Sequence, residues 1–223
     1  MFRTPLKDRP LPAYTRGEEI FNMVSHIVGG ALGFVYLILC VVTAAFHQSI
    51  IGVVSAVIYG VSVITLFTMS SIYHGLKNST AKKVLQIIDH CTIYFMIAGT
   101  YTPLALCSVR GQNTAAGWTL FGIIWGITFA AMTFTAIDHH RFKVLSMICY
   151  LGMGWCIVGF WKYTYAAVGQ MGALYMILGG ILYTVGAVLY MFGTKKRYIH
   201  SLFHLFVNVA SLMHFFCIVF YVL

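Results

Sequence analysis

Long apolar stretches separated by short polar breaks dominate this chain. Each stretch is close to the roughly 20 apolar residues that a helix needs to cross the hydrocarbon core of a bilayer. None alternates apolar and polar residues with the period of two that is typical of a membrane β-barrel. We therefore predict an all-α, polytopic bundle of seven transmembrane helices, forming one domain over residues 1–223 with a short tail at residues 1–19. The predicted stretches are residues 20–46, 51–76, 84–106, 114–137, 144–161, 171–192 and 199–223.

Composition excludes the main soluble classes. Only 9% of the 223 residues are charged and 60% are hydrophobic, whereas soluble domains average about 25% charged residues. So few charges would not cover the surface of a soluble enzyme or a nucleic-acid-binding domain, and the apolar content excludes a disordered protein. The net charge of +9 does not indicate a nucleic-acid partner, because the basic residues lie in short clusters between apolar stretches.

These basic clusters predict the orientation of the chain. With seven crossings, twelve Lys and Arg side chains fall on the side of the N-terminus and two on the other. The positive-inside rule then places the N-terminus in the cytoplasm and the C-terminus outside. The twelve are Arg3, Lys7, Arg9, Arg16, Lys77, Lys82, Lys83, Arg141, Lys143, Lys195, Lys196 and Arg197, and the two are Arg110 and Lys162.

Four ionisable residues share one predicted depth in the membrane. His74 ends the second stretch, Asp89 lies near the start of the third, and His200 and His204 lie in the first two turns of the seventh. At about 1.5 Å per residue, all four are expected within roughly 5–10 Å of the cytoplasmic interface. Ionisable residues inside membrane spans are costly, so they are candidates for function.

Their spacing is typical of a zinc site. His200 and His204 are four residues apart and project from one helix face, as do Ser70 and His74. Two imidazoles at this spacing, a third from another helix and a water or carboxylate complete the tetrahedral shell of Zn²⁺. An alternative stays open, in which these imidazoles bond to neighbouring serines or carbonyls inside the bundle.

Further polar residues follow the same helix faces. Glu19 and Asn22 are near enough to the cytoplasmic rim to contact the metal ligands, while Asn208 and Ser211 continue the face of His200 and His204 outward. This second pair would either line a wet cavity or join helices by hydrogen bonds. We expect His139 and His140 to be solvated in a loop and His90 to lie at the membrane interface.

Taken together, these motifs resemble the bacterial hemolysin III proteins. They are the prokaryotic branch of the progestin and adipoQ receptor family, which includes the adiponectin receptors and is grouped with the alkaline ceramidases. The resemblance implies seven helices in the bacterial plasma (inner) membrane and a zinc ion held by His74, His200 and His204, with Asp89 and Ser70 completing the motif. It rests on residues 18–22, the Ser70–His74 segment, Asp89-His90 leading into residues 97–103, the His200–His204 segment and His214.

Three hypotheses on function remain. The first is zinc-dependent hydrolysis of a lipid-like amide or ester, in which Asp89 takes the proton of the attacking water and Ser70 assists by hydrogen bonding. The second is a non-enzymatic protein of lipid sensing or membrane homeostasis with a structural zinc. The third is a pore-forming cytolysin, which the lack of an export signal disfavours. Membrane lipids are the expected partners, and glycines in residues 171–192 permit close helix packing within one chain or in a homo-oligomer.

Overall fold

The protein is described here from a computed structural model, which covers residues 3–193 and 196–223. Lys195, one of the twelve basic residues used above, lies outside the described residues. The described chain is helical, which confirms the all-α prediction. Its elements are η1 (Leu6–Asp8), α1 (Arg16–Phe46), α2 (Ile50–Gly75), α3 (Thr80–Pro103), η2 (Leu104–Val109), α4 (Arg110–Gln112), α5 (Thr114–Asp138), α6 (Lys143–Gly154), η3 (Cys156–Phe160), α7 (Trp161–Phe192) and α8 (Ile199–Tyr221).

Six helical segments of the described chain are long and apolar enough to cross a membrane, rather than the seven expected. The difference arises in the segment Lys143–Phe192, which holds 50 residues and contains both the fifth and the sixth predicted stretch. The two stretches are counted together because α6 passes through the short 3-10 helix η3 directly into α7. Inside α7 the backbone leaves helical geometry at Gly169, whose φ of 64° favours glycine.

Polar residues in the breaks begin four of the long helices. The side-chain oxygen of each of these residues accepts a hydrogen bond from a backbone N–H in the first turn of the helix that follows. At α1, the Glu18 carboxylate also accepts a hydrogen bond from the backbone N–H of Thr15, which completes a capping box. The caps are Thr15 for α1, Ser49 for α2, Ser79 for α3 and Asn113 for α5.

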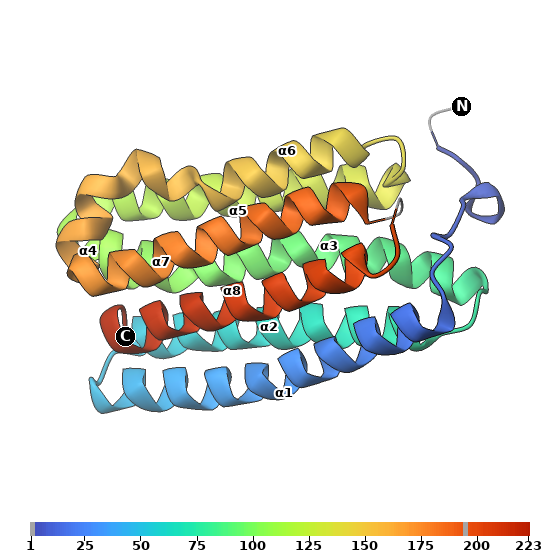
Figure 1. Cartoon of the computed structure of the whole chain (residues 1–223). Coiled ribbons are helices and arrows are strands. Elements are labelled where there is room, and N and C mark those ends of the chain that lie inside the picture. The colour runs from blue at the N-terminus through green and yellow to red at the C-terminus, as the bar shows by residue number, and fades with distance from the viewer. Residues whose placement is uncertain (1–2, 194–195) are drawn as a thin grey trace.

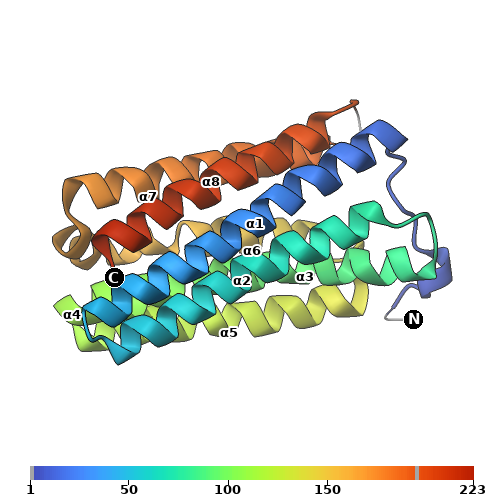
Figure 2. The same cartoon turned by 90° about the horizontal axis from the view of Figure 1, so that it is seen from below.

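The helices run roughly parallel to one axis, and the two ends of the chain lie at opposite ends of the bundle (Figures 1 and 2). At the end nearer the N-terminus, α1, α3 and α8 begin and α2 and α7 end. We call this the histidine end, because His74, His200 and His204 lie there. Helix α1 packs against α2 and α8, and α2 packs against α3.

Glycine brings three helices together just below the histidine end. A Cβ added at Gly29 of α1 would stand 2.6 Å from the Phe67 ring of α2 and would also clash with the Asn208 amide of α8. Contacts this close leave no room for a side chain, so α1 is held tightly against both helices that carry the histidines.

Candidate metal centre

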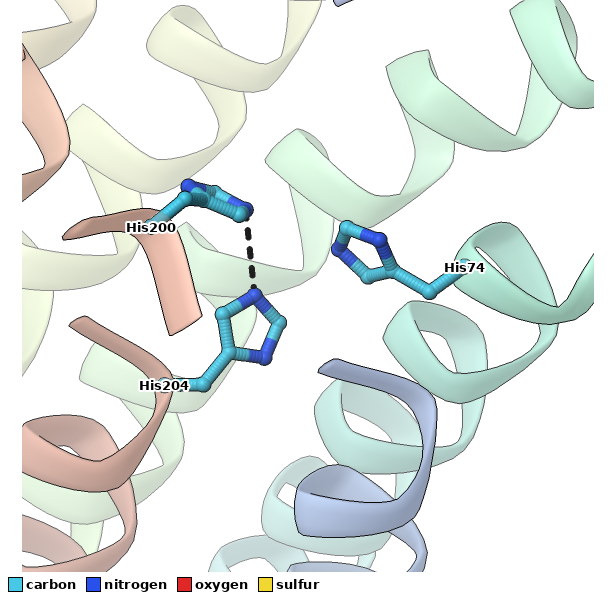
Figure 3. A group of neighbouring side chains, drawn as sticks. All are labelled: His74, His200 and His204. Atoms are coloured by element: carbon cyan, nitrogen blue, oxygen red, sulfur yellow. Dashed lines mark hydrogen bonds between the residues drawn. The ribbon is translucent and has the colours of Figure 1, made fainter. Parts of the chain in front are cut away.

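Three histidine side chains from two helices meet at the histidine end. His74 comes from the last turn of α2, and His200 and His204 come from the first two turns of α8. Each offers one ring nitrogen, and these nitrogens all lie within 4.8 Å of one another. Figure 3 shows the three rings directed into the space between α2 and α8. All three residues are buried, so this is the group of the described chain that can hold a metal ion.

One pair of the ring nitrogens has the spacing of two ligands of a tetrahedral metal ion. Nε2 of His200 and Nε2 of His204 are 3.1 Å apart, while two nitrogens bound to one tetrahedral zinc ion are about 3.3 Å apart. Nε2 of His74 is buried and has no hydrogen-bond partner among the described residues. A buried imidazole nitrogen without a partner costs free energy, and a bound cation would remove that cost.

A carboxylate orients His74 from behind. Nδ1 of His74 donates to Glu19 of α1 at 2.6 Å, and Nζ of Lys82 donates to the other oxygen of Glu19, also at 2.6 Å. Lys82 is only 2% exposed and donates a further bond to the Leu76 carbonyl. With the proton held on Nδ1 by Glu19, the lone pair of His74 Nε2 faces the other two histidines, which is the usual support for a metal ligand.

Asn22 lies beside this carboxylate, one turn further along α1. Its amide nitrogen is 3.5 Å from Nδ1 of His74. Glu19 and Asn22 therefore both reach His74 on the side away from the other histidines.

Asp89 and Ser70 lie next to the histidines but outside the three-ligand group. Both line the same cavity as His200 and His204, and the Ser70 hydroxyl is hydrogen-bonded to the Asp89 carboxyl. Asp89 also interacts electrostatically with His74. The group within 4.8 Å contains histidines alone, so Asp89 lines the cavity beside them without being a fourth close ligand.

Asn208 and Ser211 are placed differently from the residues above. The Asn208 amide donates to the Ser25 carbonyl of α1 and to the His204 carbonyl of its own helix, and the Ser211 hydroxyl donates to the Asn208 carbonyl. Neither residue lines the cavity. Asn208 therefore joins α8 to α1, one of the two roles that the sequence left open, whereas the hydrogen bond from Ser211 to Asn208 stays within α8.

A cavity of about 360 Å³ extends from the histidines into the bundle. Its middle part is lined mostly by apolar side chains such as Ile93, Met96 and Ile97 of α3. A second cavity of about 330 Å³ follows it, with Trp155 and Gly180 lining both. The site is therefore the polar end of a long, largely apolar channel between helices.

The segment before α1 covers this end of the cavity. The ring of Tyr14 stacks on that of His200 with centroids 4.8 Å apart. Upstream, Arg9 is buried and donates to the Ile137 carbonyl at 2.7 Å, and the Thr4 amide donates to Asp138 at 2.8 Å. Burial raises the pKa of the Tyr14 phenol, so at neutral pH it stays a neutral donor beside the histidines.

Sequence reasoning missed three residues of this site. His26 of α1 is buried, and its ring centroid lies 3.9 Å from that of His204. Its signal was present, since Glu19, Asn22 and His26 follow one face of a helix. From the sequence, Lys82 served only as one of the basic residues that predict topology, and Tyr14 belonged to the tail before the first helix. Nothing in the local pattern shows that either residue contacts the site.

His90 and His139 also differ from expectation. His139 is 7% exposed and not solvated, because the segment before α1 packs over the loop that carries it. His90 lines the cavity and bonds through Nε2 to the Tyr190 hydroxyl of α7. His140 is exposed, as expected of a loop residue.

A polytopic helical bundle with a buried histidine triad at one end defines the class of this protein. Within that class, residues 14–215 match the family described as Haemolysin-III related. The chain is 38% identical to "Hemolysin-3" of Bacillus cereus over 92% of both chains, and 37% identical to "Hemolysin-3 homolog" of Bacillus subtilis over 93% of this chain and 96% of the relative. The chain belongs to the haemolysin-III related family, which confirms the resemblance seen in the sequence.

A human protein is a more distant relative. The chain is 27% identical to "Monocyte to macrophage differentiation factor" of Homo sapiens, over 74% of this chain and 69% of the relative. Family membership and the six apolar helical segments make this a multi-pass protein of the bacterial plasma membrane.

Proposed function

We propose that this protein is a zinc-dependent hydrolase of a lipid-like amide or ester. The observation that carries the proposal is a group of three buried imidazoles whose ring nitrogens lie within 4.8 Å of one another, two of which, His200 and His204, line a largely apolar cavity. A zinc ion held by neutral histidines supplies a Lewis acid that activates water and polarises a carbonyl. Calcium and magnesium prefer oxygen ligands, which makes zinc the better fit to three imidazoles.

The chain's own residues supply the proton chemistry. Asp89 lines the cavity beside His200 and His204 and takes the proton of the attacking water, while the hydrogen bond from Ser70 orients its carboxylate. The water oxygen bonds to the carbonyl carbon, the carbon–nitrogen or carbon–oxygen bond breaks, and the proton passes to the leaving amine or alkoxide. The products are a carboxylic acid and an amine or alcohol.

Membrane lipids are the proposed source of the substrate. The cavity lies between helices that face the bilayer, and its middle part offers apolar side chains to a hydrocarbon chain. A long-chain substrate would place its carbonyl at the polar end, beside the histidines, and its chain among Ile93, Met96 and Ile97.

We further propose that the chain crosses the membrane seven times with the histidine end in the cytoplasm. Two observations support this topology: the chain ends lie at opposite ends of the bundle (Figure 1), and the segment Lys143–Phe192 leaves helical geometry at Gly169. Lys82, Lys83, Arg141 and Lys143 cluster at the histidine end, whereas α4 with Arg110 and the start of α7 with Lys162 lie at the other.

Reporter fusions test this topology. Alkaline phosphatase, which folds only outside the cytoplasm, should be active when fused after Leu223 and inactive when fused after Lys77. An inactive fusion at Leu223 that a cytoplasmic reporter shows to be expressed would mean that the chain crosses an even number of times.

Metal removal tests the hydrolase proposal. Purified protein in lipid nanodiscs is incubated with a long-chain fluorogenic amide and the matching ester, before chelation, after chelation and after zinc is restored. We expect turnover to fall to about a hundredth or less on chelation and to return with zinc. Melting temperature is recorded in parallel: no turnover by the zinc-loaded protein, together with a large fall in melting temperature on chelation, would favour the structural-zinc alternative.

A further inference from the structure

A second group of basic side chains lines the same cavity, apart from the three metal-site histidines. It consists of His139 and His140 in the loop between α5 and α6, and Lys143 at the start of α6. We call these three residues the mouth cluster, because His140 and Lys143 are exposed where the cavity reaches the surface at the histidine end. The hydrolase mechanism above uses none of them.

The members of the mouth cluster are close to one another and held in place. The ring centroids of His139 and His140 are 3.9 Å apart, and that of His90 lies 5.0 Å from His139. A ring nitrogen of His140 donates to the Pro10 carbonyl. Both nitrogens of His90 are occupied, by the Gln86 carbonyl and the Tyr190 hydroxyl, so His90 forms a fixed wall behind the cluster.

One ring nitrogen of His139 is buried without a hydrogen-bond partner among the described residues. His139 is 7% exposed and lines the cavity, and this nitrogen is its Nδ1. Burial, followed by the neighbouring His90 and His140, lowers the pKa of His139 to about 3. The ring is therefore neutral near pH 7, and a neutral imidazole with its proton on Nδ1 can donate to a ligand. Buried polar atoms in proteins are normally paired, so this one points to a missing partner.

Lys143 is the one charged side chain of the cluster, and Asp89 is the carboxylate that lines the same cavity. Within the described chain, both salt bridges involve Glu19, so Lys143 has no carboxylate partner there. Its Nζ lies 5.8 Å from the centre of the Tyr190 ring. Asp138 interacts electrostatically with His139 and His140, but it does not line the cavity, and it accepts bonds from the Thr4 and Arg141 amides.

The mouth cluster also lies close to the metal centre. The Tyr190 ring faces Lys143 on one side, and its centroid is 5.8 Å from that of His200. One molecule can therefore contact the mouth cluster, pass His200 and extend into the apolar part of the cavity.

We propose that the mouth cluster binds the anionic group, a phosphate or a carboxylate, of an amphiphile whose hydrocarbon chain occupies the cavity. Lys143 supplies the charge, and His139 and His140 supply ring N–H donors. This inference rests on the proposed function and deepens it, because it narrows the substrate or product class to anionic lipids.

Binding of lipids that water cannot cleave tests the proposal without any need for turnover. The probes are an ether-linked lysophosphatidic acid, a fatty acid and an ether-linked glycerol, all with the same brominated chain. Bromine quenches tryptophan fluorescence, and Trp155 lines the cavity. Chelated protein in phosphatidylcholine nanodiscs should bind the two anionic probes about tenfold more tightly than the neutral one.

Variants show whether anionic probes bind at the mouth cluster or are attracted by basic residues in general. The double variant His139→Gln, Lys143→Gln should reduce the preference for anionic probes to about twofold or less and leave the affinity for the neutral probe unchanged. Lys162 is an exposed lysine at the opposite end of the bundle, and Lys162→Gln should keep the full preference for anionic probes. Trp155→Phe should remove most of the fluorescence quenching. Equal affinity of the wild type for all probes, or a preference that survives the double variant, would overturn the proposal.

Two further results distinguish a lipid ligand from a free anion, and the hydrolase proposal from the mouth-cluster proposal. Inorganic phosphate should not displace the phosphate probe at millimolar concentration, because it lacks the chain; if it does so fully, the ligand is a free anion and the lipid assignment is wrong. A probe preference without any hydrolysis would contradict the hydrolase alone, whereas hydrolysis without a preference would contradict the mouth cluster alone.

Discussion

Purified wild-type protein is expected to contain about one zinc ion per chain, and His204→Ala less than about a tenth of that. Three buried imidazoles would hold the ion, and the nitrogens of His200 and His204 already lie 3.1 Å apart. Removing one of three protein ligands leaves two, too few to hold zinc through purification. Elemental analysis after gel filtration in zinc-free buffer gives the stoichiometry.

Two matched variants sharpen this measurement. His214→Ala changes a half-buried cavity histidine of the same helix, which bonds to the Met176 carbonyl, and should keep its zinc. Glu19→Gln removes the charge behind His74 and should weaken zinc affinity about 10–100-fold without changing the number of sites. Full zinc content in His204→Ala, with the protein still folded by its melting transition, would contradict the proposed metal centre.

The meeting of the three histidines could be predicted because it depends on local periodicity and on depth. His200 and His204 are one helical turn apart, and every helix crosses the same slab, so distances along the chain from Lys77 and Arg197 translate into depth. The same argument placed Asp89 at this level. Glu19 and Asn22 followed from their place in the first turns of α1, where the structure finds them beside His74.

The segment before α1 could not be predicted in the same way. Its thirteen residues 3–15 contain no long apolar or periodic pattern, yet Arg9 and Thr4 attach it to the end of α5, and Tyr14 stacks on His200. These contacts join residues more than 100 positions apart, which no local pattern encodes. The burial of His139 depends on them too, and this is why a loop histidine that looked solvated lines a cavity.

The number of crossings depends on the segment Lys143–Phe192, which the sequence prediction divides into residues 144–161 and 171–192. In the structure α6 passes through η3 into α7, and the backbone leaves helical geometry at Gly169. By length and apolarity the segment counts as one stretch, because η3 consists of apolar residues.

Replacing Asp89 by Asn is expected to lower kcat for the amide or ester substrate by a factor of about 10²–10⁴, the range that a general base contributes. Asparagine keeps the shape of the side chain and its hydrogen bond with Ser70 but cannot accept the proton of the attacking water. Zinc content should remain at the wild-type level, because Asp89 lies outside the group of three ligands. Turnover in nanodiscs and elemental analysis are measured on the same preparation.

The comparison variants separate proton transfer from general disturbance of the site. Ser70→Ala removes only the hydrogen bond that orients Asp89 and should lower kcat about fivefold, since the lost bond is worth about 1 kcal/mol. Asp8→Asn, at an exposed carboxylate of η1, should turn over like the wild type. If the purified Asp89→Asn protein also hydrolyses substrate at the wild-type rate, Asp89 is not the base. His26, which lines the cavity with its ring centroid 3.9 Å from that of His204, is then the candidate to take the proton.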